Sequence, residues 1–169
     1  EWYYGPQEWL LINSQLTYNP KSKKIYDKLK FGVAFQKFSE SRNSRKFNEN
    51  FLNSREEELD IFSFNLDFFK KISQSSDITY GLELINNDFG SFAISSNIND
   101  FTTLPISTRY PNNSSLNSFG LYVNYKNKII EDVFFQSGLR YSSTILEADL
   151  SQNNIYYDFP FENTILENG

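Results

Sequence analysis

The chain has 169 residues, with 16 basic and 21 acidic side chains and a net charge of −5. This acidic balance argues against a protein that neutralises phosphates, so we expect no nucleic-acid partner. The absence of Cys and His removes disulfides, Ser-His-Asp and Cys-His catalysis, and histidine-ligated zinc. We therefore expect neither an enzyme nor a cofactor or metal site.

Aromatic side chains make up 18% of the residues, although the mean hydropathy is −0.53. Such a composition is typical of a chain whose residues alternate between two different environments. No apolar run approaches the roughly 20 residues that a membrane-spanning helix needs. A soluble, aromatic-rich β-sandwich fits the composition equally well.

Six segments in which apolar residues recur at every second position predict β-strands. In chain order they cover approximately residues 7–18, 28–40, 58–70, 77–87, 117–128 and 133–149. The third is the most regular, because the apolar residues from Phe62 to Phe68 alternate with Ser63, Asn65 and Asp67. Aromatic and β-branched residues dominate all six segments, which favours strands over helices.

The connections between these segments differ in length. Three are short and polar, at residues 19–24, 71–76 and 129–132, and three are long, at residues 41–57, 88–116 and from 150 onward. Short and long connections alternate, as the periplasmic turns and extracellular loops of outer-membrane barrels do. The strands also reach the 9–11 residues needed to cross a bilayer. The sequence thus predicts an all-β, antiparallel up-and-down meander of about six long strands in a bacterial outer membrane, in contact with its lipid.

A weak repeat marks the second, fourth and sixth segments. Each contains a glycine followed by an apolar residue, namely Gly32-Val33, Gly81-Leu82 and Gly138-Leu139. The glycines fall on the polar face of each strand. Simple strand curvature is the ordinary explanation, and close approach of another backbone is the alternative.

Five polar side chains on the faces opposite the apolar ones are candidates to face the interior of a barrel: Asp67, Glu83, Asn124, Lys126 and Arg140. We expect the charged members to pair with neighbouring strands or with a plug inside the barrel, in preference to contacting a ligand.

Arg109 and Tyr110 lie in the longest internal connection, where a receptor would contact its ligand or a surface partner. A structural role is an equal alternative, since Tyr110-Pro111 would fix the path into the next strand.

Several short motifs, in order along nearly the whole chain, resemble TonB-dependent receptors of the Bacteroidetes type. They are the segment Trp2-Tyr-Tyr-Gly-Pro-Gln-Glu-Trp9 and residues 35–42, 45–48, 54–57, 80–83, 108–111, 138–141 and 159–161. None is diagnostic alone, and the resemblance rests on their order.

This resemblance implies a 22-stranded transmembrane barrel with a plug, energised by the TonB complex, that imports a scarce nutrient. Siderophores, cobalamin, glycans and peptides are all open as ligands, and so is a surface lipoprotein that caps the barrel. Neither a plug nor a TonB box is visible, so residues 1–169 are expected to form an internal part of the barrel. Two alternatives remain: a complete small barrel with a structural or adhesion role, and a soluble β-sandwich that binds a partner.

Overall fold

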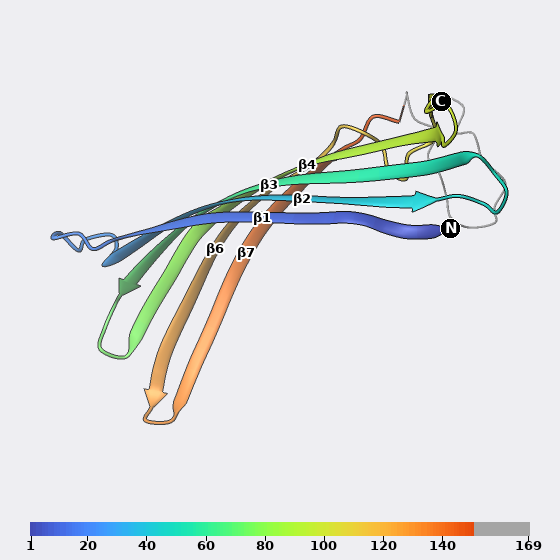
Figure 1. The fold of residues 1–169 in the computed structure, drawn as a ribbon. Coiled ribbons are helices and arrows are strands. Elements are labelled where there is room, and N and C mark those ends of the chain that lie inside the picture. Colours follow the sequence, from blue (N-terminus) through green and yellow to red (C-terminus); the bar gives the residue numbers. More distant parts are fainter. Residues whose placement is uncertain (151–169) are drawn as a thin grey trace.

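A computed structural model describes residues 1–150, which form one antiparallel sheet (Figure 1). The strands are β1 (Trp2–Tyr18), β2 (Lys28–Ser44), β3 (Phe51–Lys71), β4 (Ser76–Asn97), β5 (Thr103–Pro105), β6 (Ser114–Ile130) and β7 (Val133–Glu147). The predicted meander of six long strands is confirmed, and the three-residue strand β5 is an addition to it. None of the described residues forms a helix long and apolar enough to cross a membrane.

The long strands lie side by side in the order β1-β2-β3-β4-β6-β7, while β5 pairs with the far end of β4. Figure 1 shows the sheet twisting along its length, with the β3–β4 and β6–β7 turns at one end and the N-terminus at the other. The residues form a single sheet rather than two packed sheets, which disagrees with the sandwich alternative.

The predicted alternation of short and long connections is wrong at the start of the chain. β2 continues to Ser44 and β3 begins at Phe51, so most of the expected loop 41–57 is strand. The remaining link, residues 45–50, is shorter than the β1–β2 link, residues 19–27. Pairing continues here because backbone hydrogen bonds do not require apolar side chains. The expected strands that end near residues 87 and 149 end at Asn97 and Glu147 instead.

One face of the sheet is apolar across all the long strands. The register places Phe31, Leu66, Leu82, Leu121 and Tyr141 in one row across β2, β3, β4, β6 and β7. Much of this face is uncovered, with Leu139 at 78% and Ile12 at 57% of full exposure. Among residues 1–150, Ala93 is the only hydrophobic side chain that is buried. The sheet therefore has no core of its own, and its apolar face requires a nonaqueous environment.

The opposite face is polar, and glycines lie beside large polar side chains in its rows. One row runs through Asp67, Gly81, Tyr122 and Arg140 on β3, β4, β6 and β7. The next row runs through Asn65, Glu83, Gly120 and Ser142. Each glycine thus has a large polar neighbour in its own row, which determines how the site on this face is built.

Candidate functional site on the polar face

A tyrosine crosses one strand of the sheet to reach the next. The Tyr122 hydroxyl on β6 donates a hydrogen bond to the carboxylate of Asp67 on β3, passing over Gly81 of β4. A Cβ atom on residue 81 would lie 2.7 Å from the Tyr122 hydroxyl oxygen and would also meet the Leu66 carbonyl oxygen. The Tyr122 side chain therefore occupies the space that a side chain at residue 81 would fill.

An arginine makes the same kind of crossing one strand further on. Arg140 on β7 donates from Nη2 to Glu83 Oε1 on β4 at 2.9 Å, and from Nε to Ser142 Oγ at 2.9 Å. A Cβ atom on Gly120 of β6 would lie 2.5 Å from Arg140 Nη2. The side chains of Arg140 and Glu83 are 46% and 32% exposed, so the pair contributes at most about 1 kcal/mol in water.

These side chains enclose a hollow of about 580 Å³ on the polar face. Its polar lining comes from Asn65, Asp67, Glu83, Tyr122, Asn124 and Arg140. Asn124 lies over Gly138, where an added Cβ would meet its side-chain oxygen. Four of the five residues expected on this face therefore gather in one place. The fifth, Lys126, lies outside the hollow, with its ammonium 4.9 Å from the Phe134 ring centroid.

Sequence reasoning did not single out Tyr122 or Gly120. Their positions in the alternating pattern placed both on the polar face, but the pattern contains no information about which residues lie opposite them. A tyrosine on a polar face whose cross-strand partner is glycine is the signal that would have identified the site.

The long β4–β6 connection runs alongside β4 and contacts side chains on the polar face of β3 and β4. The Ile106 amide donates to the Ala93 carbonyl at 3.1 Å, and Arg55 Nε donates to the Ser107 carbonyl at 3.3 Å. At its far end the Asn112 side-chain oxygen accepts the Ser91 amide at 3.0 Å. Residues 106–113, here called the crossing segment, are thus fixed at both ends.

Arg109 and Tyr110 lie in the middle of the crossing segment. The Tyr110 ring packs edge-on against Phe89, with the centroids 5.3 Å apart, and the Arg109 guanidinium lies 5.7 Å from the Tyr110 centroid. Thr108, which is 7% exposed, donates through its hydroxyl to the Tyr110 carbonyl at 2.7 Å. Tyr110 remains 47% exposed, so one side of its ring is anchored and the other is accessible.

The same end of the sheet buries a carboxylate. Glu57 is 4% exposed, and neither of its carboxylate oxygens has a hydrogen-bond partner within residues 1–150. Glu40 and Ser91 are its direct cross-strand neighbours, and Glu40 is already paired with Arg42 at 2.6 Å. A buried charge without a hydrogen bond is costly, so Glu57 lowers the stability of this part of the sheet.

A sheet of long antiparallel strands, apolar and uncovered on one face and polar on the other, defines a β-barrel protein of the outer membrane. The chain matches the model of the outer membrane protein beta-barrel family over residues 15–164, and it belongs to that family. No individually curated protein matches the chain. The protein accordingly resides in the bacterial outer membrane, a lipid environment that suits the apolar face of the sheet.

Proposed function

We propose that this chain is a wall segment of a TonB-dependent receptor that imports a scarce nutrient across the outer membrane, without catalysing a reaction. The observation that carries the proposal is the crossing segment, which lies alongside β4 and holds Arg109 and Tyr110 next to Phe89 of the polar face. A connection held beside the polar face offers groups to a ligand, which suits a selective receptor better than an open pore.

The two edges of the sheet favour a barrel that has more strands than the described sheet. β1 and β7 each pair on one side only, and β1 is not paired with β7. Unpaired strand edges are not tolerated in lipid, and the smallest single-chain barrels have eight strands. These edges support a wall with further strands, and we propose the 22-stranded architecture that the sequence resemblance implies.

The proposed partners follow from this architecture. A plug in the lumen would couple the receptor to the TonB complex, and the ligand would be a siderophore, cobalamin, glycan or peptide. A surface lipoprotein over the extracellular loops also remains part of the proposal. Arg109 and Tyr110 are the residues of the described chain that we assign to ligand contact.

The test is uptake by cells that express the full-length protein with Arg109→Ala or Tyr110→Ala. Because central contact residues often cost more than 1 kcal/mol when truncated, we expect uptake at limiting nutrient to fall about tenfold. Lys46→Ala is the matched control, since Lys46 lies in the adjacent β2–β3 link and its side chain is 85% exposed. Uptake that persists after the proton-motive force is abolished would contradict the receptor assignment.

A second experiment addresses the hollow. We propose that Glu83 and Arg140 support the plug, so replacing both with Ala should increase the leak of large antibiotics into cells. Their exposed pair contributes little to stability, so the barrel should remain folded and abundant. Unchanged antibiotic permeability in a normally assembled double variant would contradict the plug-support role.

A further inference from the structure

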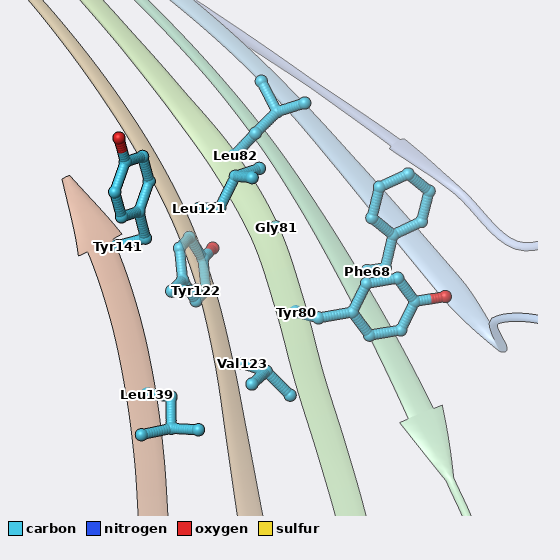
Figure 2. Close-up of a pocket in the computed structure, with 9 residues that line it drawn as sticks. All are labelled: Phe68, Tyr80, Gly81, Leu82, Leu121, Tyr122, Val123, Leu139 and Tyr141. Atoms are coloured by element: carbon cyan, nitrogen blue, oxygen red, sulfur yellow. The ribbon is translucent and has the colours of Figure 1, made fainter. Parts of the chain in front are cut away.

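The apolar face carries a groove close to the β3–β4 turn (Figure 2). One wall is the stacked pair Phe68 and Tyr80, with ring centroids 5.0 Å apart and planes 9° apart. Leu139 and Tyr141 of β7 form the other wall. Between the walls lie Leu82, Leu121 and Val123, and the groove has a volume of about 400 Å³.

The groove exists because side-chain size changes along the rows of this face. In the row Phe68, Tyr80, Val123 and Leu139, the small Val123 lies between two larger neighbours. The β7 wall is not covered by protein, since Leu139 and Tyr141 are 78% and 64% exposed. A slot lined by hydrocarbon within a lipid-facing surface fits a flexible hydrocarbon chain.

The β1–β2 link, residues 19–27, is fastened onto the Phe68–Tyr80 wall. The Tyr26 ring packs edge-on against Phe68 at 5.3 Å, and the Tyr80 hydroxyl donates to the Ile25 carbonyl at 3.2 Å. Lys70 Nζ donates to the Lys23 carbonyl at 2.6 Å. These contacts hold the link against the Phe68–Tyr80 wall of the groove.

This link presents positive charge to its surroundings. Lys21, Lys23 and Lys24 are all exposed on it. The link's acidic residue, Asp27, is already paired with Lys70 at 3.1 Å. Lysines at a membrane surface attract anionic lipid headgroups, at about 1 kcal/mol per residue.

We propose that this groove and link form a binding site for one anionic phospholipid of the periplasmic leaflet. An acyl chain lies between Tyr80 and Tyr141, and the headgroup phosphate lies against Lys21, Lys23 and Lys24. The leaflet follows from the β3–β4 and β6–β7 turns, which are short and lie at the same end of the sheet as this link, because the short turns of such barrels face the periplasm. The groove is continuous with the face that lipid already covers, so a lipid reaches it without leaving the bilayer. The site is independent of the proposed transport activity.

The experiment uses the full-length protein in nanodiscs that contain phosphatidylglycerol with a photoactivatable acyl chain. After irradiation, mass spectrometry should locate the crosslinks mainly on peptides that contain residues 80–82, 121–123 and 139–141. Unlabelled phosphatidylglycerol should displace the probe, and phosphatidylcholine should displace it about tenfold less well. Crosslinks spread evenly over the apolar faces of all strands would overturn the proposal, because they would indicate general lipid contact only.

Two variants, each with a matched control, test the acyl-chain groove and the headgroup lysines separately. Val123→Phe fills the groove and should remove the localised crosslinks, whereas Leu84→Phe, on the same face but outside the groove, should retain them. Replacing Lys21, Lys23 and Lys24 with Gln should abolish the preference for phosphatidylglycerol, while Lys46→Gln at the other end of the sheet should not. Localised crosslinks that persist in Val123→Phe, or a headgroup preference that persists in the lysine variant, would refute the corresponding half. Nutrient uptake should be unchanged, so failure here is distinguishable from failure of the receptor proposal.

Discussion

Tyr122 and Asp67 lie on strands that are not neighbours, yet the Tyr122 hydroxyl donates to the Asp67 carboxylate across the strand between them. The contact is made at Gly81, the one residue of that row without a side chain. It fastens β3, β4 and β6 together independently of their backbone ladders.

Replacing Gly81 with Ala should loosen this contact. The added methyl would displace the Tyr122 hydroxyl and press on the Leu66 carbonyl, which belongs to the backbone and cannot easily move. We expect a loss of about 1–3 kcal/mol in the free energy of unfolding, as for other overpacked sites. Gly32→Ala is the control, since its Cβ would meet only Asn65 Cβ at an ordinary 3.9 Å. Equal midpoints of urea unfolding for the two variants would show that Tyr122 does not require the absence of a side chain at residue 81.

Removing the Tyr122 hydroxyl should show how much its hydrogen bond to Asp67 contributes to the free energy of unfolding. Tyr122→Phe leaves the Asp67 carboxylate without this donor and should cost about 1–3 kcal/mol in urea unfolding. In an Asp67→Ala background the same change should cost little, giving a coupling of about 0.5–3 kcal/mol. Simple additivity of the two single variants would mean that the hydrogen bond contributes nothing to stability.

At Glu57 we predict a substitution that increases stability. Replacing it with Gln removes a buried negative charge that has no hydrogen-bond donor within residues 1–150. We expect Glu57→Gln to raise the free energy of unfolding by about 1–3 kcal/mol. Glu56→Gln is the control, because Glu56 is the next residue, is exposed, and should change stability by less than about 0.5 kcal/mol. A destabilised Glu57→Gln variant would indicate that Arg42 and Arg55 stabilise this carboxylate more than its burial costs.

The attachment of the β1–β2 link should depend on pH through Asp27. The Lys71 backbone amide, which donates to this carboxylate, and then the Lys70 ammonium hold the pKa of Asp27 below its ordinary value of 3.8. Because the folded-state pKa is lowered, the stabilisation is complete above that ordinary value and is lost as the pH falls through the folded-state pKa. Hydrogen exchange at the Lys71 amide should therefore stay protected at pH 5–7 and lose protection only under strong acid.

The variant Asp27→Asn extends this test to neutral pH. It removes the charge that pairs with Lys70 and should leave the Lys71 amide less protected at pH 7, while Asp132→Asn in the β6–β7 turn should not. If the amide exchanges at the same rate with and without the Asp27 charge, the carboxylate does not anchor the link.

The strands and their two faces were predictable because apolar residues recur at every second position from Phe62 to Phe68 and in the other segments. The ends of β2 and β3 were not predictable. Between Ser41 and Ser44, and between Asn53 and Glu57, both faces are polar, so no hydropathy signal distinguishes paired strand from loop. β5, with three residues, is too short to show a period at all.

The site was predictable only as a set of residues on one face. Glu83 and Arg140 were assigned to the polar face by their periodicity, but their ion pair depends on register, which one sequence does not reveal. The path of the crossing segment depends on tertiary contacts such as Phe89 with Tyr110, which have no local signature.

The position of Gly81 opposite Tyr122 has a consequence for assembly. A slip of one residue between strands turns apolar side chains toward the interior and is rejected by hydrophobicity. A slip of two residues keeps every side chain on its own face. The apolar surface in contact with lipid is then unchanged, so hydrophobicity does not oppose the slip. It would, however, place Tyr122 opposite Thr79 or Glu83 instead of Gly81, where the ring has no space to lie. Steric fit at the glycines thus disfavours two-residue register shifts, which burial of apolar side chains in the bilayer does not disfavour.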